Sequence, residues 1–116
     1  MTDSELLERL TQAIEDIRLA LEARGGLLEL EKKPDLRWSG LARLPNGKLL
    51  IQTQRTGRQA TPESKKAVTE AFADLTLEGR FIARVLIHQS GTDIEFPGGA
   101  RKPLDHSGIG KMLGLL

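Results

Sequence analysis

Apolar residues recur at helical spacing through the first 24 residues of the chain. Five of them are separated by steps of three and four positions and therefore share one face of a helix: Leu7, Leu10, Ile14, Ile17 and Leu21. Thr2 followed by Glu5 is a helix-starting pattern, and Gly25–Gly26 is typical of a helix end. The pattern predicts an amphipathic helix that packs on a sheet or, alternatively, against the same helix of a second copy.

An alternation of apolar and polar residues replaces the helical pattern after residue 36. Two alternating segments, 36–44 and 48–55, flank Pro45–Asn46–Gly47, and the Asn-Gly pair supplies the positive backbone dihedrals of a tight hairpin. One face of this hairpin is apolar, and the other carries Arg, Ser and Gln. A weaker alternation over residues 27–32 predicts a short edge strand that precedes the hairpin.

The segment from residue 61 to residue 96 mixes the two periods. Thr61–Pro62–Glu63 has the cap, the proline and the acid of a helix start. A helix that ends at Gly79 turns four apolar residues inward: Val68, Ala71, Phe72 and Leu75. Residues 80–88 predict a central strand, and residues 92–96 a partner strand joined to it by a turn. On the central strand, one face is expected to carry Phe81, Ala83, Val85 and Ile87, and the other Ile82, Arg84, Leu86 and His88.

Together these elements predict one α+β domain over residues 1–116. It has two layers, with an antiparallel sheet of four to five strands and two main helices in the order α-β-β-β-α-β-β, followed by a short C-terminal helix. The N-terminal amphipathic helix takes residues 1–26, the sheet with the second helix residues 27–104, and an apolar tail residues 105–116. This order of elements resembles that of small secretion chaperones, which dimerise and hold an unfolded partner.

Charge is distributed unevenly along the chain, although the net charge is only +1. Residues 1–36 hold nine acids and five bases, whereas residues 37–116 hold twelve bases and seven acids. Within the second part, residues 37–62 contain five bases and no acid. The asymmetry predicts an acidic element and a basic surface, and a basic surface indicates an anionic partner.

Six bases of the predicted hairpin and second helix are candidate phosphate contacts: Arg37, Arg43, Arg55, Arg58, Lys65 and Lys66. Ser39, Gln52, Thr53 and Gln54 add groups that hydrogen-bond to phosphates or bases. The alternative is a solvated sheet face whose bases discourage edge-to-edge pairing. With one Trp, three Phe and no Tyr, the chain is poorly supplied with rings on which bases stack.

The last ten residues concentrate apolar side chains around three glycines. Five of these residues are candidates for binding a partner: Ile109, Met112, Leu113, Leu115 and Leu116. They dock on the core of their own chain or across a homodimer, or they cover a different partner. A single cation, Lys111, is too little charge for a membrane-surface peptide.

Motifs for catalysis or metal binding are weak. The chain has no cysteine, and its two histidines, His88 and His106, are far apart, so neither a zinc site nor another cofactor is expected. Asp105–His106–Ser107 contains the residue types of a catalytic triad, but neighbours in sequence do not provide triad geometry. Gly98–Gly99 and Gly108–Ile109–Gly110–Lys111 lack the spacing of a phosphate loop. No enzymatic activity is predicted.

The sequence therefore predicts a cytoplasmic, non-enzymatic binding module that contacts an anionic partner, most simply DNA or RNA. An acidic protein surface presents carboxylates to the same guanidinium groups and is the second partner class. The alternative is a protein-interaction subunit, an adaptor, chaperone or inhibitor, that uses the N-terminal helix and the apolar tail. No stretch approaches the ~18 apolar residues of a membrane span, so no membrane partner is expected.

Overall fold

The computed structural model describes residues 3–32, 37–55, 69–88 and 90–115. These residues form an α+β fold with two helices and one antiparallel sheet of seven strands. The elements follow in this order: α1 (Asp3–Glu22), β1 (Leu27–Glu31), β2 (Ser39–Leu44), β3 (Gly47–Arg55), β4 (Thr69–Leu77), β5 (Arg80–His88), β6 (Gly91–Glu95), β7 (Arg101–Pro103) and α2 (His106–Gly114).

The sheet is a meander in which every strand pairs with its neighbours in sequence, in the order β1-β2-β3-β4-β5-β6-β7. Tight turns join β2 to β3 and β4 to β5, as the pairings of Leu44 with Gly47 and of Leu77 with Arg80 show. Gly47 has φ +133°, in the region that favours glycine, which is why Asn46-Gly47 marks this turn. The predicted hairpin over residues 36–55 is confirmed in its strands, its turn and its buried face.

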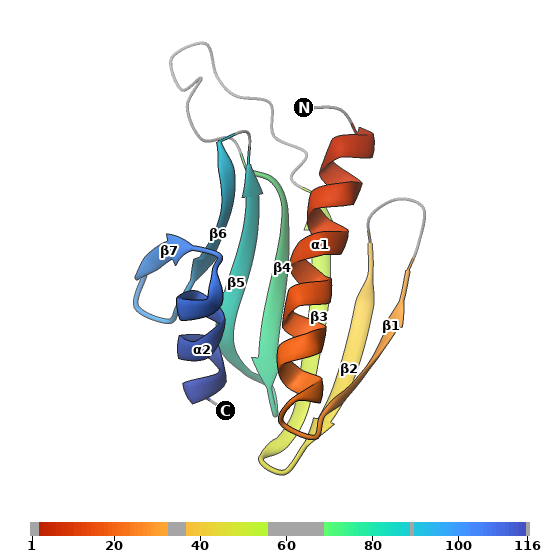
Figure 1. Ribbon diagram of the computed structural model, residues 1–116, viewed down its shortest axis with the longest axis vertical. Coiled ribbons are helices and arrows are strands. Elements are labelled where there is room, and N and C mark those ends of the chain that lie inside the picture. The colour runs from red at the N-terminus through yellow and green to blue at the C-terminus, as the bar shows by residue number, and fades with distance from the viewer. Residues whose placement is uncertain (1–2, 33–36, 56–68, 89, 116) are drawn as a thin grey trace.

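Both helices lie over the same face of the sheet, and no helix of the described residues lies on the opposite face (Figure 1). The apolar stripe of α1 is buried on the sheet and consists of Leu6, Leu10, Ala13, Ile14, Ile17 and Leu21. Small residues such as Ala42, Ala71 and Ala73 lie on the covered face and leave room for the helix. Leu7, which the periodicity placed in the stripe, is 39% exposed, and Leu6 takes its place. The α1 stripe thus forms the core of its own chain.

The predicted second helix is wrong over the residues that the structure describes. Residues 69–77 form strand β4, between β3 and β5. Its side chains alternate, since Ala71, Ala73 and Leu75 are buried while Phe72 and Asp74 are half-buried. Ala71 and Leu75 fit both the helical period and a period of two, whereas Phe72 fits only the helical one. Hydrogen-bonded pairing with β3 and β5 fixes this segment as a strand. The helix-start signal at 61–63 lies outside the described residues.

The extra strands change the expected architecture. The sheet has seven strands where four to five were predicted, and no described helix interrupts it between β3 and β5. The described order α-β-β-β-β-β-β-β-α therefore departs from that of the secretion chaperones at β4. The short C-terminal helix is confirmed as α2.

A bulge in β5 corrects the predicted faces of that strand. Leu75 pairs with Ala83 and Thr76 pairs with Phe81, so Ile82 has no partner of its own on β4. One extra residue moves every side chain beyond it to the other face of the sheet. Ile82 and Ala83 are consequently both buried, and Phe81 lies on the face away from the helices, whereas the sequence pattern placed it in the core.

Candidate interaction surface on the open sheet face

The sheet face opposite the helices is called the open face below, and two of the predicted basic residues lie on it. Arg37 and Arg43 are exposed and alternate with the buried Trp38 and Ala42. Six positions along an extended chain separate the two arginines by about 20 Å, so they do not form one cluster. Arg55 ends β3, but its side chain, like Arg58, Lys65 and Lys66, lies outside the described residues.

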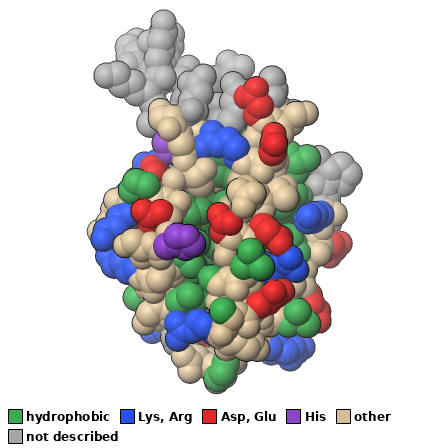
Figure 2. Space-filling model, in the orientation of Figure 1, with side chains coloured by type: hydrophobic (Ala, Val, Ile, Leu, Met, Phe, Trp, Pro, Cys, Tyr) green, Lys and Arg blue, Asp and Glu red, His purple; other side chains and the backbone are tan. Residues whose placement is uncertain are grey.

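Charges on the open face are balanced. Its described bases are Arg37, Arg43, Lys48, Arg84 and Arg101. Its described acids are Glu29, Glu31, Asp74, Asp93 and Glu95. The helix-covered face also shows acidic and basic side chains interspersed (Figure 2). Within the described residues, neither the open face nor the helix-covered face has the continuous basic surface that the charge asymmetry of the sequence predicted.

The predicted partner-binding residues of the tail are largely used inside the chain. Met112 is fully buried, Ile109 is 8% exposed, and Leu113 packs against the core. Leu115 is 39% exposed, and Leu116 lies outside the described residues. Two polar contacts fix α2 in place. The Asp105 carboxylate caps the helix by accepting from the Gly108 N–H at 2.9 Å, and an Arg24 guanidinium N–H donates to the Leu113 carbonyl.

Arg84 is the centre of the open face. Its Nε donates to Asp74 Oδ1 at 2.5 Å and its Nη2 to Asp74 Oδ2 at 3.2 Å, a two-point ion pair between β5 and β4. The guanidinium also lies 4.6 Å from the centroid of the Phe72 ring and 5.9 Å from that of Phe81. The hydrogen bond to Asp74 raises the pKa of Arg84 above its ordinary value, so the group keeps its charge.

One polar row crosses all seven strands through this pair. The register joins directly opposed residues in the order Glu31, Ser39, Gln52, Asp74, Arg84, Glu95 and Arg101. Large apolar residues flank the row on the four strands β2 to β5: Leu41, Leu50, Phe72, Phe81 and Leu86. These five residues together with the Asp74–Arg84 pair are the open-face cluster.

The open-face cluster was only partly visible in the sequence. Alternation along the hairpin already turned Leu41 and Leu50 away from the core. Phe72 was assigned to the inward face of a helix, and Phe81 to the inward face of β5. Its position depends on the bulge at Ile82, and a period-two pattern carries no signal for a bulge.

A histidine–aspartate pair at the β5–β6 turn has a structural role. His88 Nε2 lies 2.9 Å from Asp93 Oδ2, which also accepts from Arg101 Nε at 2.9 Å, and His88 Nδ1 accepts from the Ser90 backbone N–H. Both ring nitrogens are therefore engaged in closing the turn, and His88 is 8% exposed. Among the described residues no group of three or more His, Asp or Glu side chains is placed to hold a metal ion.

Comparisons with known proteins give no relative: no family model, no curated protein and no solved structure matches the chain. In the part of the chain that the structure describes, no helix is long and apolar enough to cross a membrane. The open face and its cluster are therefore the basis of the function proposed below.

Proposed function

We propose that the protein is a non-enzymatic interaction module that binds a protein surface through the open-face cluster. The partner that we propose is a second copy of the same chain. The main support for this proposal is the residue composition of the open-face cluster. Antiparallel sheets with one solvated face normally turn polar residues outward. Here four half-buried apolar residues, the buried Leu86 and a stacked, ion-paired arginine occupy that face. Aromatic and arginine side chains, with few lysines, are typical of the centre of protein–protein interfaces.

The same geometry argues against a nucleic acid on this face. Single-stranded recognition on a sheet needs aromatic rings whose faces are free to stack on bases. The Arg84 guanidinium already lies over the Phe72 ring at 4.6 Å. The balanced charges of the open face also give no net attraction for a phosphate backbone.

Charge complementarity favours a second copy as the partner. Stacked sheets lie about 10 Å apart with nearly aligned strands. Consider a two-fold axis that runs parallel to the strands, midway between the two stacked sheets and level with the space between β4 and β5. This axis places the polar row of one copy over the polar row of the other, with the strand order reversed. Asp74 then faces Arg84 of the second copy, and Phe72 faces Leu86 of the second copy. Such an arrangement is self-complementary in charge and in apolar surface, as a two-fold interface requires.

The experiment is sedimentation equilibrium of the full chain over a range of concentrations. We expect a dimer that Leu50→Arg converts to a monomer, because the change places a charge among the apolar residues of the cluster. Leu19→Arg is the matched control, since Leu19 is 56% exposed on α1, on the opposite side of the sheet. A wild-type chain that stays monomeric at millimolar concentration, or a dimer that only Leu19→Arg dissociates, would contradict the proposal.

A charge exchange tests the geometry of the dimer. The double variant Asp74→Arg with Arg84→Asp keeps an ion pair in each chain and remains self-complementary. Mixed with wild type, however, it brings like charges opposite one another at both positions. We expect each protein to dimerise alone and the mixed dimer to be depleted, as measured by native mass spectrometry. Statistical mixing of the two proteins would show that β4 and β5 are not at the two-fold axis.

The predicted anionic partner of the basic residues 37–66 stays a prediction. It is tested by titrating salt into complexes with mixed-sequence single- and double-stranded DNA and RNA. Affinity that falls steeply with salt and is lost in Arg55→Glu with Arg58→Glu would identify a contact with several phosphates. Absence of binding at about 50 mM salt would exclude it.

A further inference from the structure

A groove separates the two helices on the side of the molecule away from the open face. It has a volume of about 550 Å³ and is lined by Asp16, Leu19, Ala20, Asp105, His106 and Ile109. Its size falls within the range of about 300–1,000 Å³ that is typical of small-molecule sites. Figure 1 shows α1 and α2, the two helices that supply the lining residues, in front of the sheet. Near the ends of the helices, the Arg24–Leu113 hydrogen bond joins its two walls.

Leu19, Ala20 and Ile109 form the apolar part of the groove lining, and the side chain of Leu19 is 56% exposed. Such exposure of a large apolar residue is not required by the packing of α1, whose stripe is complete without it. An occupant with a hydrocarbon body would remove this surface from water, which contributes roughly 25 cal/mol for each Å² of apolar area.

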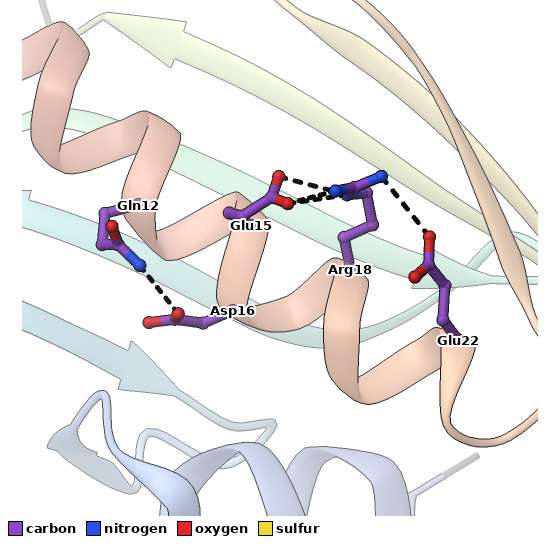
Figure 3. Close-up of polar contacts among 5 residues, drawn as sticks. All are labelled: Gln12, Glu15, Asp16, Arg18 and Glu22. Atoms are coloured by element: carbon purple, nitrogen blue, oxygen red, sulfur yellow. Dashed lines mark hydrogen bonds and ion pairs between the residues drawn. The ribbon is translucent and has the colours of Figure 1, made fainter.

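The polar lining of the groove consists of the two carboxylates of Asp16 and Asp105 and the imidazole of His106. Asp16 accepts a hydrogen bond from Gln12 Nε2 at 2.9 Å through Oδ1, and a carboxylate offers about four acceptor positions. Figure 3 shows that Gln12 and Asp16 lie toward α2, whereas Arg18 lies on another side of α1 and binds Glu15 and Glu22. Among the described residues no cation forms an ion pair with Asp16 or Asp105, in contrast to Asp74 and Asp93.

We propose that this groove binds a small organic cation with an apolar body, of the aryl- or alkylammonium class. Its ammonium group donates to the carboxylates of Asp16 and Asp105, and its hydrocarbon part packs on Leu19, Ala20 and Ile109. Charge complementarity favours a cation, because the carboxylates of Asp16 and Asp105 would repel an anion of the same shape. The inference is independent of the open-face cluster, which lies on the other side of the sheet.

The test is a titration of the isotope-labelled full chain with phenethylammonium, followed by amide chemical shifts. We expect saturable shifts at Leu19, Ala20, His106 and Ile109. Phenylpropionate and phenethyl alcohol share the apolar body but carry a negative charge or none. They are expected to bind at least about tenfold more weakly, because neither offers a cationic donor to the carboxylates. Equal saturation by all three probes, or shifts that never saturate, would overturn the proposal.

Charge-removing variants locate the site. Asp16→Asn with Asp105→Asn keeps the cap of α2, because asparagine also caps helices well, and is expected to weaken phenethylammonium binding at least about tenfold. Glu29→Gln removes one charge from the open face and serves as the control, with unchanged affinity expected. Binding that survives the double variant, or that Glu29→Gln weakens equally, would place the cation elsewhere and refute the assignment.

Discussion

Arg9, in the first half of α1, donates a hydrogen bond from Nη1 to the backbone carbonyl of His88 at 2.5 Å, across 79 positions of sequence. Its Nη2 donates to Thr92 Oγ1 at 3.1 Å, so one guanidinium binds both strands of the β5–β6 hairpin. The helix is thus tied to the sheet by a specific polar contact in addition to its apolar stripe.

Replacing Arg9 with Met is expected to lower the free energy of unfolding by about 1–3 kcal/mol. The variant keeps an apolar stem but removes charge-assisted hydrogen bonds from a partly buried site and leaves the His88 carbonyl without this donor. Urea denaturation measures the loss. Arg18→Met is the control, because the Arg18 contacts to Glu15 and Glu22 lie on the helix surface and a smaller change is expected. A larger loss for Arg18→Met would contradict the assigned role of Arg9.

Two glycines of α2 respond oppositely to the same substitution. A Cβ at Gly108 lies 2.9 Å from Ile94 Cγ2 and 3.2 Å from the Pro103 carbonyl oxygen, whereas a Cβ at Gly110 has open space around it. Gly108→Ala is therefore expected to destabilise the protein by about 1–3 kcal/mol through overpacking. Gly110→Ala is expected to stabilise it by about 0.5–1 kcal/mol through helix propensity. Thermal unfolding of both variants checks the signs, and two shifts of equal sign would refute the docked position of α2.

Thr53 carries a buried hydrogen-bonding hydroxyl. Its Oγ1 accepts from the Trp38 backbone N–H at 2.5 Å and donates to the Trp38 carbonyl at 3.2 Å. Thr53→Val keeps the volume but removes both bonds, and we expect it to lower the free energy of unfolding by about 1–3 kcal/mol. Thr53→Ser keeps the hydroxyl and loses one methyl group, for which about 1 kcal/mol is expected. Chemical denaturation of the two variants separates hydrogen bonding from packing, and a neutral Thr53→Val would show that the hydroxyl does not contribute.

The pH dependence of stability includes a contribution from Glu15. Its hydrogen bond to Arg18 lowers the pKa of this carboxyl below the ordinary value of 4.5. The folded chain therefore holds this proton less tightly than the unfolded chain. The contribution is present above pH 4.5 and is lost as the pH falls through the lower, folded pKa. Glu15→Gln should be less stable than wild type at neutral pH and converge with it in acid. Denaturation at several pH values measures the difference, and a gap that widens in acid would contradict the sign.

The sequence predicted elements whose signals are local. The β2–β3 hairpin follows from alternation and the Asn46–Gly47 turn, and α1 follows from its stripe and its glycine end. Strand β4 was missed because Ala71 and Leu75 fit a helical period together with Phe72, and equally a period of two together with Ala73 and Leu77. The choice between them depends on hydrogen bonds with β3 and β5, which are remote in sequence.

The open-face cluster could not be predicted from local sequence signals either, because it depends on which strands are neighbours in the sheet. Arg84 and Asp74 are ten positions apart, and nothing in their spacing indicates an ion pair until β4 and β5 are recognised as neighbours. Phe81 joins the cluster only through the bulge at Ile82. Counting charges along the chain indicated a basic surface, but the fold interleaves acids from β1, β4 and β6 with bases from β2, β3, β5 and β7.

The meander has a consequence for how the chain is made. Each strand finds its partner in the segment synthesised next to it, so the sheet can assemble hairpin by hairpin as the chain emerges from the ribosome. The helix α1 is synthesised before the strands, yet it packs on β4 and β5 as well as on β1. Its apolar stripe therefore stays exposed to solvent until β4 and β5 have been translated. During that interval the stripe is a natural binding surface for chaperones, which hold exposed apolar segments until a core forms.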